Sequence, residues 1–375
     1  MLRKPKEKVR YAVVGLGYIA QTAVLPAFRN ARKNSKLVAL VSGDKEKLKK
    51  LGEKYRVEKR CLYSEFEDLM KSGEVDAIYI ATPNFYHRNI METAAKYGVH
   101  VLCEKPMAVT TEDCYSMISE AEKYNIKLMI AYRLHFEAAN LEAIKRAQSK
   151  RIGDLRIFNS VFTFQVKDQN NIRLDVVERG GGPLYDIGIY CINASRYLFK
   201  AEPVEVFATA TKTKDSRFRR NEETISCILK YPEGKMANFT VSFGAFPTAD
   251  YDLVGTKGRI RLEKGYEYES TMTLKTYEEG KTFIKRYPKR DQFAPELIYF
   301  SDCIQRNKKV EPSGEEGLMD IKILEALLLS IDLGSPITLE EIHKRTRPGD
   351  NQKITRPPFF QPKLINARGP EGTKH

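Results

Sequence analysis

The sequence predicts an α/β protein with two domains, the first built on a parallel sheet and the second an α+β domain with a mostly antiparallel open sheet. Its 375 residues exceed what one ordinary hydrophobic core accommodates. Apolar runs alternate with helical patterns in the first third, whereas strand-like segments follow one another directly after residue 136. We expect domains at 1–134 and 135–345, and a C-terminal arm rich in Pro and Gly at 346–375.

The first element is a short strand at 10–14 that runs into the sequence Gly-Leu-Gly-Tyr-Ile-Ala and then into a helix. In this setting the first glycine allows a tight turn, the second admits a pyrophosphate close to the backbone, and the alanine lets the helix pack on the strand. The helix N-terminus attracts the anion. A second buried strand at 37–41 completes a βαβ unit, so we predict a Rossmann dinucleotide site. Its candidate residues here are Gly15, Gly17, Tyr18, Ile19 and Ala20.

The end of the second strand indicates which dinucleotide binds. NAD sites usually carry an acid there for the ribose 2′-hydroxyl, but this strand ends in Ser42-Gly43, with Lys47 nearby. A neutral hydroxyl and a lysine suit a 2′-phosphate, so we favour NADP. Asp44 is the competing observation, because an acid here could serve NAD. We interpret Asp44 instead as the N-cap of a helix at 45–54.

Three further strands, at 77–81, 100–103 and 127–131, each end in polar residues. Loops at the carboxyl ends of parallel strands are where open α/β sheets bind ligands. A helix is expected to begin near His87; a packing role for that histidine and for His135 competes with a ligand role. The candidates at these ends are Thr82, Pro83, Asn84, His87, Glu104, Lys105, Tyr132 and Arg133.

The second domain is expected to begin with a helix at 137–148 and to close with helices at 295–306 and 315–333. Short turns separate the strand-like segments between them, which favours an antiparallel sheet. The expected strands are 156–164, 204–211, 224–231, 236–242, 250–254, 259–262 and 271–276.

The stretch 180–193 is the strongest candidate for chemistry in this domain. Three glycines and Pro183 form a loop, and the apolar spacing from Leu184 predicts a helix. Asp186 and Tyr190 are then four residues apart on one face. A carboxylate beside a phenol can handle protons, although a tyrosine that caps a core is the commoner use of such a pair.

Composition excludes several classes of protein. The net charge of +14 is spread among acids without an Arg-rich aromatic stripe, so we expect no nucleic-acid site. No apolar run is long enough for a membrane span. The six cysteines form no C-x-x-C pair and no two of the five histidines have metal-ligand spacing, so we expect no metal. The basic opening resembles a signal n-region, but the run after it reads as a strand, and we expect a cytoplasmic chain.

Four motifs together give a resemblance to a known family. They are residues 15–20, Ala-Thr-Pro-Asn at 81–84, Glu-Lys-Pro at 104–106 and Gly-Gly-Gly-Pro-Leu-Tyr-Asp-Ile-Gly-Ile-Tyr at 180–190. In this order they resemble the glucose–fructose oxidoreductase / inositol dehydrogenase (Gfo/Idh/MocA) family along nearly the whole chain. Tyr190, where many relatives have histidine, and Ser42-Gly43 resemble its NADP-dependent aldose branch. The Trp that branch often has beside Arg173 is Ile172 here.

The resemblance implies an NADP-dependent oxidoreductase acting on CH–OH groups of sugars. Lys105 would be the active-site lysine near the nicotinamide, Asp186 the acid facing it and Tyr190 the proton acceptor, with Tyr132 and Arg173 contacting the sugar. The expected reaction oxidises C1 of a cyclic aldose to the lactone, with a second sugar reduced if NADP stays bound. Homo-oligomers, dimers or tetramers, are expected. An anhydrofructose-type reductase, an inositol-type dehydrogenase and a non-catalytic NADP sensor remain alternatives.

Overall fold

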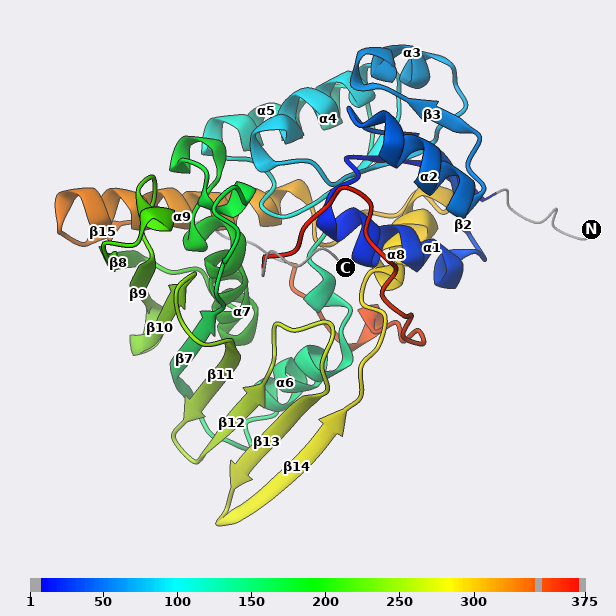
Figure 1. Ribbon diagram of the computed structural model, residues 1–375. Coiled ribbons are helices and arrows are strands. Elements are labelled where there is room, and N and C mark those ends of the chain that lie inside the picture. Colours follow the sequence, from blue (N-terminus) through cyan, green and yellow to red (C-terminus); the bar gives the residue numbers. More distant parts are fainter. Residues whose placement is uncertain (1–7, 341–345, 371–375) are drawn as a thin grey trace, which may run out of the picture. The chain divides into compact units, whose positions relative to one another are not determined.

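The computed structural model describes residues 8–340 and 346–370, and the chain divides into two compact units (Figure 1). Unit 1 takes in the described parts of Met1–Arg133, Asp291–Leu318 and Arg356–His375. Unit 2 takes in Leu134–Arg290 and the described parts of Met319–Thr355. Grouped by contacts, residues 291–318 belong to unit 1, whereas the sequence-based division placed them in the second domain. The contact-based units do not test whether the chain forms separate domains with boundaries at 134 and 345, so these boundaries stay a prediction.

Unit 1 is built on a six-stranded parallel sheet in the order β3-β2-β1-β4-β5-β6. Residues 11–14 of the central strand β1 are fully buried, which explains their continuous apolar sequence. The parallel Rossmann-type sheet predicted from the sequence is confirmed. The strands are β1 (Val9–Val14), β2 (Ser35–Val41), β3 (Lys59–Cys61), β4 (Ala77–Ile80), β5 (His100–Cys103) and β6 (Leu128–Ile130).

Helices connect these strands, and α8, which comes much later in the sequence, also packs in unit 1. The hydroxyl groups of Tyr11 and Ser35 each lie 2.8 Å from the hydroxyl of Ser301 in α8, so α8 is fixed to β1 and β2. The helices of unit 1 are α1 (Leu25–Ala31), α2 (Lys45–Tyr55), α3 (Phe66–Lys71), α4 (His87–Lys96), α5 (Thr111–Lys123) and α8 (Ala294–Gln305), with short turns η1 (Ala20–Val24), η2 (Tyr63–Glu65) and η3 (Asn84–Tyr86).

Unit 2 is built on a nine-stranded sheet in the order β14-β13-β12-β11-β7-β10-β9-β8-β15. Among the strands that the structure describes in this sheet, only the β7–β10 pair is parallel, so the predicted mostly antiparallel sheet is confirmed. The strands are β7 (Leu155–Thr163), β8 (Glu205–Thr211), β9 (Thr224–Tyr231), β10 (Lys235–Ser242), β11 (Thr248–Gly255), β12 (Gly258–Glu263), β13 (Met272–Glu278), β14 (Lys281–Tyr287) and β15 (Ile337–Thr338).

The helices of unit 2 pack on one face of this sheet, where a buried ion network joins two of them. Arg196 in α7 is fully buried and pairs with Glu202 at 2.6 Å and Asp320 of α9 at 2.5 Å. Buried charges need such partners, because an unpaired one would cost several kcal/mol. The helices are α6 (Ala138–Gln148), α7 (Ile189–Phe199) and α9 (Gly314–Leu333, which begins in unit 1), with short turns η4 (Arg133–His135, at the boundary), η5 (Ile172–Leu174), η6 (Val177–Arg179), η7 (Leu184–Gly188), η8 (Ser216–Phe218), η9 (Pro232–Gly234) and η10 (Asp350–Gln352).

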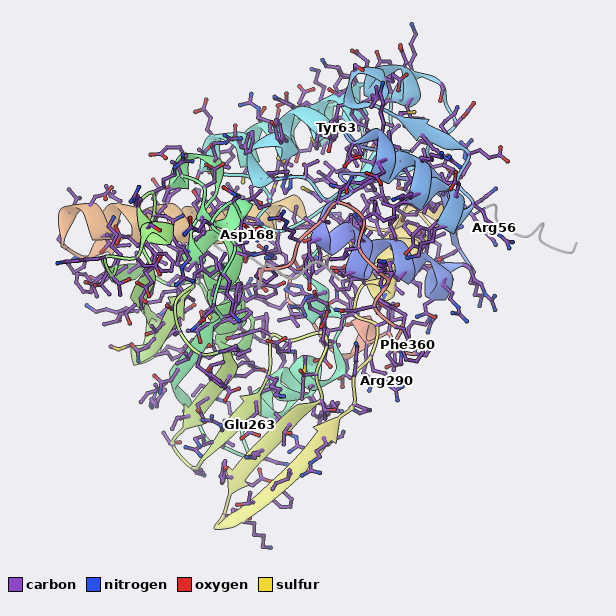
Figure 2. All side chains as sticks on the ribbon, viewed as in Figure 1. Arg56, Tyr63, Asp168, Glu263, Arg290 and Phe360 are labelled. Carbon is purple, nitrogen blue, oxygen red and sulfur yellow. The ribbon has the colours of Figure 1, made fainter. Side chains whose placement is uncertain are left out.

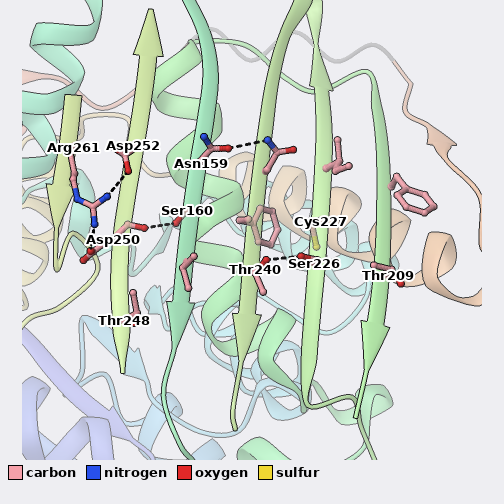
Figure 3. Close-up of a pocket in the computed structure, with 15 residues that line it drawn as sticks. Asn159, Ser160, Thr209, Ser226, Cys227, Thr240, Thr248, Asp250, Asp252 and Arg261 are labelled. Carbon is pink, nitrogen blue, oxygen red and sulfur yellow. Dashed lines mark hydrogen bonds and ion pairs between the residues drawn. The ribbon is translucent and has the colours of Figure 1, made fainter. Parts of the chain in front are cut away.

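The opposite face of the unit 2 sheet carries a shallow hollow of about 510 Å³ (Figure 3). Side-chain hydrogen bonds cross the strands there, between Asn159 and Asn238 and between Ser226 and Thr240. Large apolar side chains are exposed beside them, namely Ile157, Val161, Ile228 and Met236. An apolar and polar mixture of this kind is typical of a surface that meets another protein.

Candidate functional site

The two glycines of the loop after β1 lie in different surroundings. Gly15 has φ +93°, and a Cβ on it would lie 2.6 Å from the carbonyl oxygen of Ala81, so only glycine fits. A Cβ on Gly17 would meet nothing within 4 Å, so the space over its backbone is open. The turn opens into the π-helical turn η1, where Ala20 is fully buried. These are the two different glycine roles that the sequence predicted.

The end of β4 offers a polar atom without a protein partner. The hydroxyl oxygen of Thr82 is buried and makes no hydrogen bond to the described residues. It stands beside the glycine loop, because the methyl carbon of Thr82 would lie 2.9 Å from a Cβ on Gly15. A buried hydroxyl of this kind is normally hydrogen-bonded, so the atom suits a ligand that completes the site. Pro83 and Asn84 follow it at the start of η3.

His87 is placed between two of the predicted ligand loops. The ring is fully buried, with Nε2 3.0 Å from the carbonyl oxygen of Thr82 and Nδ1 3.0 Å from that of Pro106. Burial lowers the pKa of the imidazole. His87 therefore ties the loop after β4 to the loop after β5. His135 is also fully buried, with its Nε2 2.8 Å from the side-chain oxygen of Asn193 in unit 2.

The end of β2 carries the residues expected to choose between NAD and NADP. Ser42 is buried and its hydroxyl accepts a hydrogen bond from the backbone N–H of Asp44. The Asp44 side chain accepts from the backbone N–H groups of Glu46 and Lys47, at 2.9 and 3.0 Å. Asp44 is thus the N-cap of α2, as predicted. Gly43 is exposed, and Lys47, in the first turn of α2, is half-buried.

The end of β5 places a buried carboxyl group directly before the candidate lysine. Glu104 accepts a hydrogen bond from the Tyr79 hydroxyl at 2.7 Å, and its other oxygen accepts the backbone N–H of Lys105 at 3.3 Å. Burial raises the pKa of Glu104, while the charge of Lys105 opposes that rise. The Lys105–Pro106 peptide bond is cis. Glu104 thus fixes the backbone from which the Lys105 side chain extends.

The neighbouring strand end contributes Tyr132 and Arg133, both almost fully buried. A guanidinium nitrogen of Arg133 donates to the side-chain oxygen of Gln292. Sequence reasoning missed another group here, Glu296 in α8, which is fully buried and whose two carboxylate oxygens make no hydrogen bond to the described residues. Burial and the charge of Glu104 raise the pKa of Glu296 well above its usual value. An acid in the first turn of an apolar helix was the only signal in the sequence.

The candidate residues of unit 2 lie on the glycine loop and the turn that follows it. Gly181 has no room for a side chain, since a Cβ would lie 1.9 Å from the carbonyl oxygen of Asp175. The helix predicted from Leu184 begins as the π-helical turn η7, and the α-helix starts only at Ile189. Such π turns are frequent at functional sites, because they change the direction in which side chains point.

Asp186 and Tyr190 each have a defined environment in unit 2. A carboxylate oxygen of Asp186 accepts from Arg173 Nε at 2.6 Å, and both side chains are about one-fifth exposed. Asn171 accepts from the backbone N–H of Arg173 and so holds the start of η5. The half-buried ring of Tyr190 packs against Phe162 and Tyr266, with ring centroids 5.7 and 6.0 Å away. Asp186 is thus placed by an arginine, which the helical spacing alone did not indicate.

The structure groups the predicted site residues as two sets. Gly15 to Ala20, Ser42, Thr82, Glu104, Lys105 and Arg133 belong to unit 1, and Arg173, Asp186 and Tyr190 belong to unit 2. Ile172, at the position where the aldose branch often has Trp, is 61% exposed. Within residues 8–340 and 346–370, no three His, Cys, Asp or Glu side chains are arranged to hold a metal ion. No described helix is both long and apolar enough to cross a membrane.

A parallel sheet with an open glycine loop and an unpartnered threonine hydroxyl defines unit 1 as a dinucleotide-binding domain. Residues 9–132 match an oxidoreductase family with an NAD-binding Rossmann fold, and residues 141–261 match the Gfo/Idh/MocA C-terminal domain. The chain belongs to the Gfo/Idh/MocA family of oxidoreductases, as the sequence motifs indicated.

Two relatives and one solved structure show how far the similarity extends. D-xylose 1-dehydrogenase (NADP+) from Haloarcula marismortui is 32% identical over 88% of this chain and 93% of its own. D-xylose 1-dehydrogenase (NADP+) 2 from Haloferax volcanii is 25% identical over 88% of this chain and 99% of its own. The structure of aldose–aldose oxidoreductase from Caulobacter crescentus, in complex with glycerol, is 36% identical, has a TM-score of 0.84 and covers 89% of this chain and 100% of that chain.

Proposed function

We propose that this protein is an NADP-dependent sugar oxidoreductase that oxidises C1 of a cyclic aldose, glucose- or xylose-like, to the aldonolactone. The full-length similarity to xylose dehydrogenases that use NADP and to an aldose–aldose oxidoreductase supports the substrate class and the cofactor. The observation in the structure that supports the proposal is the carboxyl edge of the unit 1 sheet, where Glu104 holds the backbone of Lys105 at the end of β5 and the loop after β1 leaves open space over Gly17.

The residues of unit 1 fit NADP. Backbone N–H groups at Gly17 and the start of η1 would hold the pyrophosphate, and the Thr82 hydroxyl would gain the partner that it lacks. Ser42 and Lys47 would bind the 2′-phosphate, and Lys105 would lie near the nicotinamide. Loop residues Tyr18, Ile19, Gly43, Pro83 and Asn84, and the buried His87, Glu104 and Arg133, would shape the same site. The nicotinamide supplies the acceptor for the hydride that leaves sugar C1.

The residues of the chain supply the proton chemistry. Tyr190, as the phenolate, takes the proton of the C1 hydroxyl while the C1–H bond breaks, which leaves the C1=O group of the lactone. Lys105 stabilises the phenolate by opposite charge. Asp186, held by Arg173, orients Lys105 or the sugar hydroxyls, and Tyr132 helps to shape the sugar site. With Tyr190 as the acid, the reverse direction reduces the carbonyl of a second sugar, and the aldose–aldose relative supports such a second half-reaction.

The test is the substitution Tyr190→Phe, which keeps the ring packed on Phe162 and Tyr266 and removes only the hydroxyl. Loss of a general acid–base group costs about 10²–10⁴-fold in rate, so aldose oxidation should fall by that factor. The affinity for NADPH, titrated by its own fluorescence, should stay within about twofold. Full activity of Tyr190→Phe with every aldose would exclude Tyr190 from this role.

A substrate panel separates the proposal from its alternatives. Aldoses, anhydro sugars and inositols should be assayed with NADP and with NAD. Oxidation of inositols but not aldoses would make the protein a polyol dehydrogenase. NADP binding without turnover of any substrate would make it a non-catalytic sensor.

We also propose that the protein forms homo-oligomers through the open face of the unit 2 sheet and acts in the cytoplasm on small molecules. The exposed Ile157, Val161, Ile228 and Met236 on that face support self-association, because several large apolar side chains exposed on one sheet face can be covered by a second copy of the chain.

A further inference from the structure

The C-terminal segment lies along the nucleotide side of unit 1, where Figure 1 shows it in red beside α1 and α2. Hydrogen bonds hold this segment at two places, one near the C-terminal end of α1 and one in η1, just before α1. At the far end, Asn30 donates a hydrogen bond to the carbonyl oxygen of Pro357 at 2.9 Å. At the near end, the buried Gln21 pairs with both backbone groups of Ile365, donating to its carbonyl oxygen and accepting its N–H, each at 2.8 Å. The segment therefore reaches the first turn after the glycine loop.

Beyond Ile365 the segment contacts the two elements that frame the cofactor site. Gly369 lies against the Tyr18 ring of the glycine loop, since a Cβ on it would come within 3.0 Å of that ring. Asn366, with φ +46°, donates from its side-chain amide to Asp44 Oδ2 at 3.1 Å and to Glu46 Oε2 at 2.7 Å. One amide group from the end of the chain thus bridges the two acids at the start of α2.

With Asn366 in place, all four oxygens of these two acids are engaged. Asp44 Oδ1 accepts the backbone N–H groups of α2, and Glu46 Oε1 pairs with Lys50 at 2.5 Å. The remaining oxygens, Asp44 Oδ2 and Glu46 Oε2, are those that accept from Asn366. An acid at this strand end binds the ribose 2′-hydroxyl in NAD sites and repels a 2′-phosphate. Whichever group occupies these two oxygens therefore influences which cofactor is accepted.

We propose that Asn366 is a cofactor-selectivity residue: its amide occupies Asp44 and Glu46 so that the site at the end of β2 accepts the 2′-phosphate of NADP rather than the 2′-hydroxyl of NAD. This rests on the proposed function, because it assumes that a dinucleotide binds at the glycine loop. It assigns the selectivity to two positions more than 300 residues apart, Asp44 and Asn366, in addition to Ser42 and Lys47.

The test is the substitution Asn366→Gly, which removes the amide and keeps a backbone that glycine adopts without strain at this φ. Dissociation constants are measured by calorimetry for NADP and NAD, and for the fragments 2′,5′-ADP and AMP, which differ only in the 2′-phosphate. Both hydrogen bonds of Asn366 are exposed to solvent, and a typical net hydrogen bond corresponds to about three- to tenfold in affinity. The ratio of the NAD to the NADP dissociation constant should fall by that factor, and the fragment ratio should fall with it.

Two further variants sharpen the result. Asn366→Asp has nearly the same shape but adds a third carboxylate, so 2′,5′-ADP affinity should fall further than in Asn366→Gly, and added salt should reduce the difference. Phe360→Ala is the control, because Phe360 lies in the same segment, is 98% exposed and is labelled in Figure 2. It should leave both ratios unchanged.

The outcomes distinguish this inference from the proposed function. A wild-type protein that binds NADP no better than NAD would overturn the cofactor assignment itself. A wild-type protein that prefers NADP, together with an Asn366→Gly variant whose ratios are unchanged, would overturn only the role of Asn366. Equal loss of AMP and 2′,5′-ADP affinity in that variant would do the same, because it would show a general covering role.

Discussion

Glu104 and Glu296 are two carboxyl groups that unit 1 buries within the electrostatic reach of Arg133. Burial raises the pKa of both, and an uncompensated buried carboxylate is costly. Glu104 has hydrogen-bond partners in Tyr79 and the backbone of Lys105, whereas neither carboxylate oxygen of Glu296 makes a hydrogen bond to the described residues. The carboxyl group that holds the backbone N–H of Lys105 is therefore that of Glu104, whose pKa is raised by burial and lowered by the charges of Lys105 and Arg133.

His100 in β5 gives a prediction about stability and pH. Burial, and then the charge of Lys127, lower the pKa of its imidazole to about 4, and its Nδ1 accepts the backbone N–H of Lys127 at 3.0 Å. An unfolded histidine titrates near pH 6.5, so between about pH 6.5 and 4 the unfolded chain binds a proton that the folded chain does not. The stabilisation that the neutral ring provides is present above about pH 6.5 and is lost as the pH falls toward 4.

Urea unfolding at intervals between pH 7 and pH 4 measures this contribution. The substitution His100→Asn keeps an acceptor near the Nδ1 position and removes the titration, so its unfolding free energy should fall less steeply over the window than that of the wild type. Parallel curves for the two proteins would show that His100 makes no such contribution.

At the scale of the element, we expect alanine substitutions at the two glycines of the loop after β1 to act differently, one on stability and the other on cofactor binding. A Cβ on Gly15 would strike the backbone of Ala81 at 2.6 Å, so Gly15→Ala should lower the unfolding free energy by at least about 1–3 kcal/mol. A Cβ on Gly17 meets nothing, so Gly17→Ala should leave the melting temperature nearly unchanged. It would instead occupy the space proposed for the pyrophosphate.

Calorimetry with NADP and thermal unfolding without it separate the two effects. Gly17→Ala should bind NADP at least tenfold more weakly while it unfolds at the wild-type temperature. Gly73→Ala is a control for NADP binding, because Gly73 also has open space around it but follows α3. Its φ of +69° adds backbone strain that Gly17 does not have, so Gly73→Ala should lower the melting temperature and keep the wild-type NADP affinity. Normal NADP affinity in Gly17→Ala would contradict the placement of the pyrophosphate.

The elements that the sequence could predict are those with a buried face. Strands β1, β2, β4 and β5 bury nearly every residue at their carboxyl ends, and their apolar runs were clear. Strand β14 was missed because nearly all its residues are exposed at the edge of the sheet, so no apolar alternation marks it. The two residues of β15 and the three of β3 are not buried, so no apolar run indicates a strand there, whereas the equally short β6 is fully buried and was predicted.

The site residues that could be predicted from the sequence are those whose position is set by nearby residues. Residues in motifs, such as Gly15, Asp44 and Glu104, could be placed because local turns and caps fix them. Glu296 and Asn366 could not, because each reaches the nucleotide side only through tertiary contacts made by a distant part of the chain. Pairing Asp186 with Arg173 also depends on the fold of the loop between them.

At the scale of the whole molecule, the open face of the unit 2 sheet predicts how the protein assembles. Ile228 is 37% exposed there and lines the hollow beside Asn238 and Thr240. The substitution Ile228→Lys places a charge in the proposed interface, where an unpaired buried charge costs several kcal/mol. Sedimentation should then show a smaller assembly than the wild type.

The control for this prediction is Tyr115→Lys, since Tyr115 in α5 of unit 1 is 50% exposed and does not belong to that sheet. It should sediment like the wild type. A wild-type monomer at micromolar concentration would contradict the proposed oligomer, and an unchanged assembly in Ile228→Lys would show that another surface mediates it.

Unit 1 is discontinuous in sequence, and this has a consequence for how the protein is made. As the ribosome releases the chain, strands β1 to β6 emerge first, but the Ser301 hydroxyl that satisfies Tyr11 and Ser35 arrives only after the whole of β7–β14. The amide that bridges Asp44 and Glu46 arrives later still. The first residues of unit 1 are therefore translated first, but its tertiary contacts are complete only when the C-terminal segment has been translated.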